Sequence, residues 1–392
     1  MPRFTFRSSI FLLLASFLCA ACETTRLTDT PASERAVIST RTENTITLLF
    51  AGDIMAHNVN YEKGDFDAIW REVAPVISAA DLAFANVEAP VADGLPWSSY
   101  PNFNMHAPYI DAAIAAGFDV FSLANNHTND QGLEGMRQTL AYFKKKKDVR
   151  ACGIKETANA PLTYQVITKN GWTVLFVAFT ELVNARTDAQ YFDYIPPKSE
   201  KHDTILADLK RLRDENPCDI FVVSVHADEP EYIRTVGDRQ RQFYRNLIAQ
   251  AHADIVWSNH AHVVKEWEVV PADRTTRGGL IMYANGNTIS GQRTAPKFGT
   301  PDNSRDYTGD GLLMTVTLKR AANAAGTPAL TIKSLAPQFI TTYITPNRRF
   351  VLRLLDDDLP RSLRRAGLDD WADYLAERKK LMEPIKEQST WQ

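Results

Sequence analysis

From residue 46 onward, short apolar runs alternate with stretches whose apolar positions have a helical period. Apolar runs of about four to eight residues predict buried strands, and apolar positions three or four apart predict amphipathic helices. We therefore expect strands at residues 46–50, 82–87, 120–123, 220–225, 255–258, 263–270 and 280–283, and helices at 66–80, 108–116, 133–147, 203–214 and 238–252. This alternation predicts a layered α/β domain.

Two later parts of the chain depart from this alternation. Asn170-Gly171 separates apolar runs at residues 162–166 and 173–179, and its tolerance of positive φ predicts a β-hairpin. The runs at 312–318 and 330–344 predict edge or antiparallel strands, and a charged helix is expected at 371–382. We expect one large domain at residues 46–345 and a C-terminal helical extension at 346–392.

The N-terminal segment has the order of a secretory signal peptide. Basic residues precede an apolar run at residues 10–18, and small residues lead to Cys22. Ala20-Ala21-Cys22 also resembles a bacterial lipobox, which predicts lipidation of the cysteine; cleavage near Ala21 without a lipid is the alternative. We expect a signal peptide at residues 1–22, a flexible tether at 23–45, and an exported lipoprotein anchored to the membrane on the periplasmic or extracellular face of the cell envelope.

The composition and charge of the chain argue against a nucleic-acid partner and leave other classes of function open. Of the 392 residues, 44% are hydrophobic and 23% are charged, as in ordinary globular proteins. The formal net charge of −3 gives no sign of the basic face that nucleic-acid-binding proteins usually carry. We therefore expect no nucleic-acid partner.

Side chains of the metal-ligand type directly follow five predicted strands: Asp53, Glu88, Asn125-Asn126-His127, His226 and Asn259-His260-Ala261-His262. Ligands of open α/β sheets bind beyond the carboxyl ends of the strands, so we expect these side chains to converge on one rim. Carboxylates and imidazoles bind Zn, Mn or Fe, and two ions about 3.5–4 Å apart can clamp a phosphoryl group. His260 and His262 would point to the same side if their segment were extended.

Each residue also has a structural alternative. Asp53 could cap a helix, Glu88 could pair with an arginine, the two asparagines could be turn residues, and His226 could be a buried core histidine. The convergence of five strand ends favours metal binding. Outside this set, we expect His57, His106, His202 and His252 to be structural or exposed. Arg293, Lys297 and Arg305 lie in a loop that could meet an anionic substrate, although surface basic residues need no ligand.

Six ordered motifs carry a resemblance to a known family: GDIM at 52–55, NVEAP at 86–90, LANNHTNDQG at 123–132, a histidine at 226, NHAH at 259–262 and YANGN at 283–287. This series, over about residues 46–290, resembles the CapA family, which is associated with poly-γ-glutamate capsule synthesis and shares the fold of the calcineurin-like metallophosphatases. The resemblance implies an α/β fold, a layered α-β-β-α sandwich of the metallo-dependent phosphatase type.

The resemblance also implies roles for individual residues. Asp53 and His262 match ligands of a first metal, Glu88 a bridging carboxylate, and Asn126, His226 and His260 ligands of a second metal. His127 matches a histidine that stabilises or protonates a leaving oxygen, and Asp130 an acid three residues further on. Met55 departs from the pattern, because phosphatases of this fold usually have histidine there; this puts first-metal affinity and substrate choice in question.

Three classes of function follow. The first is a metal-dependent hydrolase or transferase with two divalent ions (Mn, Fe or Zn), acting on a cell-envelope phosphoester or glutamyl polymer. The second is an accessory subunit that helps a membrane synthase to extend or export an anionic polymer. The third, a solute-binding lipoprotein of unrelated fold, leaves the ordered motifs unexplained. The expected partners are thus an anionic polymer or small-molecule substrate, the membrane, and membrane synthase subunits.

Overall fold

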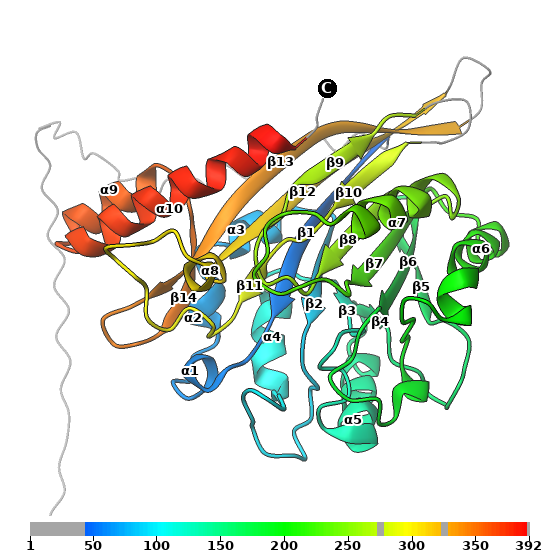
Figure 1. The fold of residues 1–392 in the computed structure, drawn as a ribbon, viewed down its shortest axis with the longest axis horizontal. Coiled ribbons are helices and arrows are strands. Elements are labelled where there is room, and N and C mark those ends of the chain that lie inside the picture. The colour runs from blue at the N-terminus through cyan, green and yellow to red at the C-terminus, as the bar shows by residue number, and fades with distance from the viewer. Residues whose placement is uncertain (1–43, 273–277, 323–327, 390–392) are drawn as a thin grey trace, which may run out of the picture. The chain divides into compact units, whose positions relative to one another are not determined.

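Two β-sheets pack face to face, and helices cover their outer faces (Figure 1). The computed structural model describes residues 44–272, 278–322 and 328–389. The predicted signal peptide, the lipobox and nearly all of the predicted tether lie outside the described residues, so they stay predictions. Among the described residues, no helix has the length and apolar composition needed to cross a membrane.

The first sheet has the strand order β14-β13-β12-β1-β2-β3-β4, and β11 pairs with β1 near the end of that strand. Strands β1 to β4 are parallel, whereas β12, β13 and β14 extend the sheet by antiparallel pairing. Their bounds are β1 (Thr45–Ile54), β2 (Leu82–Val87), β3 (Val120–Ser122), β4 (Arg150–Cys152), β11 (Asn287–Ile289), β12 (Asp310–Ala322), β13 (Pro328–Ile344) and β14 (Phe350–Leu354).

The second sheet has the order β5-β6-β7-β8-β10-β9, in which β6, β7, β8 and β10 are parallel. Asn170 and Gly171 join the antiparallel strands β5 and β6 with positive φ angles of 49° and 73°, so the predicted hairpin is present. The bounds are β5 (Tyr164–Lys169), β6 (Trp172–Thr180), β7 (Ile220–His226), β8 (Ile255–Asn259), β9 (Trp267–Val270) and β10 (Gly279–Met282).

Three groups of helices cover the sheets. The outer face of the first sheet packs against α2 (Asp67–Trp70), α3 (Ala74–Ile77), α4 (Ala107–Ala115) and α5 (Gly132–Lys144). The outer face of the second sheet packs against α6 (Glu200–Glu215) and α7 (Asp238–Ala249). Buried residues of α9 (Asp358–Arg365) and α10 (Asp369–Gln388) pack with inward residues of β12 and β13, and short α1 (Asn58–Tyr61), η1 (Ala189–Tyr191) and α8 (Ser304–Tyr307) lie in loops. The predicted layered α-β-β-α sandwich is confirmed.

Strand β1 is buried on both faces, which explains its continuous apolar run. Phe50 points between the sheets, where it stacks on Phe84 at a centroid distance of 4.7 Å and meets Trp257 at 5.8 Å. The indole N–H of Trp257 donates to the Ala51 carbonyl at 2.8 Å and thereby joins β8 to β1. These contacts hold the ends of β1 and β8 next to each other.

Some predicted elements differ from the structure. The helix expected at residues 66–80 is two short helices. Pro75 is the second residue of α3, and its missing N–H does not allow one continuous helix through this position. The strand expected at 263–270 begins only at Trp267. Strand β12 is antiparallel, which was one of the two predicted alternatives, but it is not at an edge of the sheet, since it pairs with both β1 and β13.

Candidate metal centre

Two groups of metal-ligand side chains meet beyond the carboxyl ends of β1, β2, β7 and β8. One group is Asp53, Glu88 and His262; the other is Glu88, His226 and His260. Within each group, one potential ligand atom from each residue lies within 4.8 Å of the others. All five side chains are buried, and Glu88 belongs to both groups. The structure thus brings together residues from four strand ends around one carboxylate.

Glu88 lies between the two groups. Its Oε1 is 3.7 Å from Nε2 of His226 and 3.7 Å from Nε2 of His262. Although both carboxylate oxygens are buried, neither has a hydrogen-bond donor among the residues that the structure describes. Burying a charge without partners is unfavourable unless a cation compensates it. The orphaned carboxylate and its neighbouring imidazoles therefore fit divalent cations.

Amide side chains surround both groups. Asn126 Oδ1 is 2.7 Å from His226 Nε2, which places the predicted amide ligand beside the second group. Asn86 donates to Asp53 Oδ1 at 2.8 Å, and Asn287 Oδ1 lies 3.0 Å from His262 Nδ1. Such contacts orient metal-ligand side chains and fix the protonation state of imidazoles.

The position of Asp53 depends on a close approach between two segments. The Asp53 N–H donates to the Gly286 carbonyl at 3.0 Å. A Cβ added at Gly52 would lie 1.8 Å from that carbonyl oxygen, so only glycine fits there. The GDIM and YANGN segments, far apart in the sequence, therefore meet at the site.

His260 and His262 do not lie in an extended segment, as the sequence suggested. Their φ angles are 99° and 56°, and a left-handed conformation of a non-glycine residue costs roughly 1–3 kcal/mol. His260 lies next to His226, with ring centroids 4.9 Å apart, whereas His262 is 3.2 Å from Asp53. The strained turn thus sends the two histidines to different donor groups.

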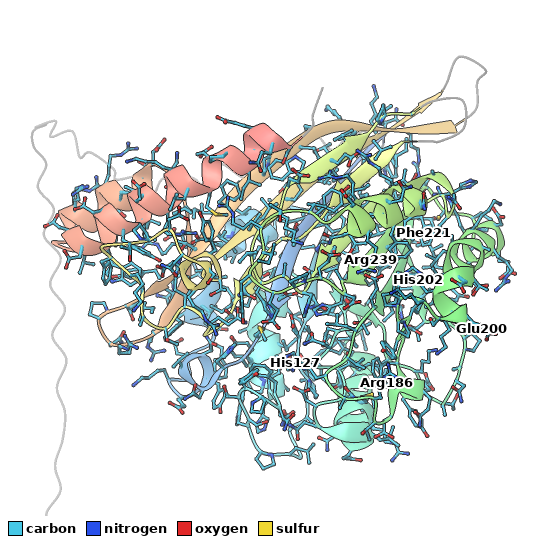
Figure 2. The ribbon with its side chains drawn as sticks, in the orientation of Figure 1. His127, Arg186, Glu200, His202, Phe221 and Arg239 are labelled. Atoms are coloured by element: carbon cyan, nitrogen blue, oxygen red, sulfur yellow. The ribbon has the colours of Figure 1, made fainter. Side chains whose placement is uncertain are left out.

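His127 and Asp130 form a pair in the loop after β3 (His127 is labelled in Figure 2). His127 Nδ1 is 2.7 Å from Asp130 Oδ2, which also accepts the Phe103 N–H at 2.7 Å. The Phe103 ring packs edge-on against His127 at 4.8 Å. Burial raises the pKa of Asp130, although the hydrogen bond with His127 opposes this shift. The pair fixes the orientation of the imidazole beside the donor groups.

Two residues of the site were missed in the sequence. Asn184 Nδ2 lies 3.2 Å from His127 Nδ1, and its Oδ1 accepts from Asn126 at 3.2 Å. Glu181 donates its N–H to the His226 carbonyl at 2.9 Å and accepts the N–H of Asp228 at 3.2 Å. His202 and Arg239, labelled in Figure 2, hold the Glu181 carboxylate at 3.3 and 3.0 Å. Glu181 directly follows β6, so the strand-end rule would have found it.

His57 and Arg293 are structural. Burial, with smaller contributions from His262, His127 and Arg305, lowers the pKa of His57 to about 3. His57 accepts the Gly291 N–H at Nδ1, so it is a neutral neighbour of the site. Arg293 is not a surface residue: it is buried and binds Asp310 at 2.9 Å.

A pH dependence follows from the buried histidines. Burial first, and the neighbouring histidines second, place the pKa of His226 and His260 well below the usual value. Below pH about 6.5 the unfolded chain therefore binds protons that the folded chain does not. As the pH falls below about 6.5, the free energy of unfolding of the EDTA-treated wild type should decrease by about 1.4 kcal/mol per histidine for each pH unit, relative to a His226→Gln/His260→Gln variant. Urea unfolding between pH 5 and 7 measures this difference; parallel profiles for the two proteins would contradict it.

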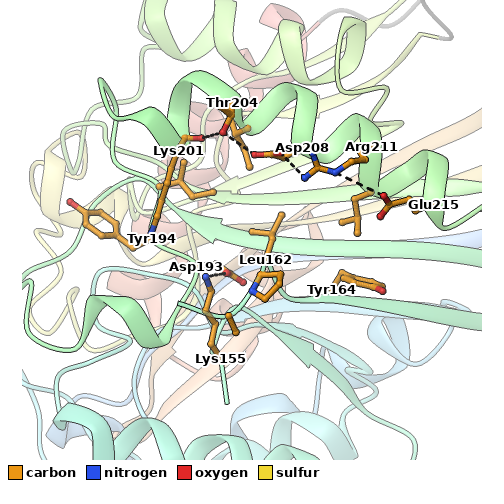
Figure 3. Close-up of a pocket in the computed structure, with 15 residues that line it drawn as sticks. Lys155, Leu162, Tyr164, Asp193, Tyr194, Lys201, Thr204, Asp208, Arg211 and Glu215 are labelled. Carbon is orange, nitrogen blue, oxygen red and sulfur yellow. Dashed lines mark hydrogen bonds and ion pairs between the residues drawn. The ribbon is translucent and has the colours of Figure 1, made fainter. Parts of the chain in front are cut away.

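A separate cavity of about 400 Å³ lies beside α6 (Figure 3). Its charged lining residues pair mainly with each other: Lys155 with Asp193 at 3.2 Å, and Arg211 with Asp208 at 2.8 Å. None of the five donor residues lines it. This cavity is therefore separate from the candidate metal centre.

The fold and the two donor groups define a metallophosphatase-like protein. The chain belongs to the family of bacterial capsule synthesis proteins, PGA_cap, whose model matches residues 47–292. The CapA resemblance is thereby confirmed.

Two curated relatives carry capsule-related names. The chain is 27% identical to the PGA biosynthesis protein CapA of Bacillus subtilis (strain 168), over 72% of this chain and 70% of the relative. It is 26% identical to the capsule biosynthesis protein CapA of Bacillus anthracis, over 90% and 82%. A hypothetical protein from Thermus thermophilus aligns with 75% of this chain and 98% of its own, at a TM-score of 0.44 and 19% sequence identity.

Proposed function

We propose that this chain is an exported, lipid-anchored protein that takes part in the biosynthesis or processing of a poly-γ-glutamate-like capsule polymer, in which it acts as a metal-dependent hydrolase. Family membership and the names of the two Bacillus relatives support the capsule polymer. The main observation in favour of hydrolase activity is the carboxylate of Glu88, which belongs to both donor groups and lacks a hydrogen-bond donor among the described residues. The N-terminal signal and lipobox pattern supports export and anchoring.

The five donor residues would hold two divalent ions of Mn, Fe or Zn. Asp53, Glu88 and His262 would hold one ion; Glu88, His226 and His260, with Asn126, would hold the other. When bound, the ions supply Lewis acidity that polarises a carbonyl or phosphoryl oxygen and lowers the pKa of water. The lowered pKa of His226 and His260 keeps both imidazoles neutral near pH 7, as metal ligation requires.

His127 would handle the proton of the leaving group. Water attack on a γ-glutamyl carbonyl breaks the C–N bond, and the departing nitrogen needs a proton. With its Nδ1–H donated to Asp130, His127 would take a proton from the attacking water at Nε2 and pass it to the departing nitrogen, and Asp130 would stabilise the imidazolium formed between the two transfers. The edge-on packing of the Phe103 ring restricts the imidazole to this orientation.

A non-catalytic role is the second candidate. Met55 occupies the position where phosphatases of this fold usually have a histidine, and it is buried. The first donor group thus has one imidazole, His262, against two in the second group. In this alternative, the chain is an accessory subunit of a membrane synthase or export complex, and its centre binds polymer carboxylates without hydrolysing them.

The test combines metal content with complementation. The purified full chain should contain about two equivalents of metal, and a His260→Ala/His262→Ala variant should lose them. In a strain without the chromosomal copy, wild type should restore the capsule polymer and the variant should not. Full restoration by a metal-free variant would contradict the metal-dependent hydrolase and favour the accessory subunit. A folded wild type that stays metal-free on reconstitution would also contradict it.

A further inference from the structure

Tyr232 and Arg305 lie next to the candidate centre on the side of His262. Tyr232, in the loop after β7, donates its N–H to the Ala261 carbonyl at 2.9 Å. Its ring centroid is 6.2 Å from that of His262, with an interplanar angle of 33°. The guanidinium of Arg305 lies 4.9 Å from the Tyr232 ring centroid, and Nη1 is 3.3 Å from the Tyr232 hydroxyl. The three side chains form a continuous series from the donor group outward.

The guanidinium of Arg305 retains donors for a ligand. The side chain is exposed, and no carboxylate pairs with it in the described part of the chain. A guanidinium has five N–H donors, and Tyr232 accepts from Nη1 alone. The edge formed by Nε and Nη2 can therefore bind a carboxylate or phosphate group in a bidentate manner.

The backbone that carries Arg305 is fixed from both sides. Asn303 Oδ1 accepts the N–H groups of Arg305 and Asp306, each at 3.1 Å. Tyr307, at the end of α8, bonds Arg234 at 2.7 Å, and the guanidinium of Arg378 lies 4.0 Å from its ring centroid. Because α8 is held against the core, the Arg305 guanidinium is kept near the centre.

A cation beside the site suits a polyanionic substrate. The loop that carries Tyr232 has an acidic residue, Glu231, directly before it, so Arg305 supplies positive charge where the neighbouring loop does not. An anionic polymer carries further charges beyond the one that reaches the centre, and these need a positive partner nearby. Arg305 is also among the groups that lower the pKa of His57, the buried neighbour of the site.

We propose that Arg305 binds a second anionic oxygen group of the substrate, adjacent to the group that reaches the donor residues. This inference rests on the proposed function, since it names the feature by which that site would select a polyanion. The shared chemistry is a carboxylate or a phosphate, and Tyr232 acts as the positioning residue that holds the guanidinium. A substrate with one anionic group would gain nothing from Arg305, whereas one with repeated anionic groups would.

Binding of two probes to the Mn²⁺-loaded full chain, purified in neutral detergent, tests this proposal. Calorimetry with tri-γ-glutamate and with inorganic phosphate would compare wild type, Arg305→Ala and Arg305→Lys. Charge-assisted hydrogen bonds contribute enough that Arg305→Ala should weaken tri-γ-glutamate binding about tenfold or more. The affinity of Arg305→Lys should lie between those of wild type and Arg305→Ala, because lysine keeps the positive charge but cannot bind an anionic group in a bidentate manner. The control Arg137→Ala, at an exposed arginine of α5, should bind as wild type does.

The outcomes distinguish failure of the proposed role of Arg305 from failure of the proposed polymer function. Equal tri-γ-glutamate binding by wild type and Arg305→Ala would overturn the role of Arg305 and leave the polymer function standing. Inorganic phosphate has one anionic group and should bind wild type and Arg305→Ala alike. Phosphate binding that depends on Arg305, with no tri-γ-glutamate binding, would overturn both the second-group role of Arg305 and the glutamyl substrate. A metal-loaded wild type that binds neither probe would overturn both. Loss of metal from Arg305→Ala would indicate a structural role and would also overturn the proposal.

Discussion

Replacement of Glu88 by glutamine is expected to remove most of the bound metal and to stabilise the metal-free chain. Glu88 is the only residue common to both donor groups among the described residues, so its loss removes a ligand from each. Elemental analysis should therefore show well under one equivalent in Glu88→Gln against about two in wild type. The control Glu134→Gln, at an exposed position of α5, should keep the wild-type content.

The gain in stability has a separate physical cause. Burial first, and the charge of Asp53 second, raise the pKa of Glu88 well above its usual value. A group whose folded pKa is raised loses stability as the pH rises from its unfolded value of about 4.3 through the folded value. Glutamine does not titrate, so the metal-free variant should exceed wild type by about 1–3 kcal/mol at pH 8, and by less at pH 5. Urea unfolding in EDTA measures this; a metal-free variant less stable than wild type would contradict it.

The strand ends were predictable because a parallel sheet imposes its own geometry. Asp53, Glu88 and His226 follow apolar runs that the periodicity identifies directly, and the carboxyl ends of parallel strands share one edge. The division of these residues into two donor groups came from the resemblance of the ordered motifs to the CapA family, because each donor group combines residues from several segments. The sheet order, with β12 beside β1, was not predictable, because antiparallel pairing between segments so far apart in the sequence leaves no local signal.

Residues that depend on distant contacts were harder to predict. Arg293 lies in a polar loop, and only its contacts with Asp310 and Thr341 reveal that it is buried. Asn184 reaches His127 from a long connection between β6 and α6 that has no periodic pattern. The turn at His260 and His262 requires positive φ at non-glycine residues, which sequence preference argues against. Tertiary contacts decide all three cases.

Replacement of Arg378 is expected to destabilise the whole described fold, although it lies in the segment predicted as a C-terminal extension. Arg378 is fully buried on α10, and its Nε donates to Asp310 Oδ2 at 2.8 Å. Burial alone would raise the pKa of Asp310, but Arg378 and Arg293 together lower it below its usual value. Removing one partner of a buried ion pair costs about 3–5 kcal/mol, because the remaining charge stays buried.

Urea unfolding of Arg378→Met measures this cost with little change in side-chain volume. The neighbouring Lys379→Met is the matched control. Lys379 pairs with the more exposed Asp357 and Glu383, so its replacement should change stability by less than about 1 kcal/mol. An Asp310→Asn/Arg378→Met double variant should be less destabilised than the sum of the single variants, because the two side chains are in contact. Equal effects of Arg378→Met and Lys379→Met would contradict the prediction.

The Arg378→Met variant also tests whether contacts of α10 affect the candidate centre. Arg378 Nη1 donates to the Pro301 carbonyl at 2.8 Å, and its guanidinium covers Tyr307 at the end of α8. Asp310 begins β12, and the Gly311 beside it lies close to Asn287, which contacts His262. Under conditions where Arg378→Met is still folded, we therefore expect weaker anion binding through Arg305 with little loss of metal. Loss of metal without loss of anion binding would show that α10 acts on the donor groups and not on α8.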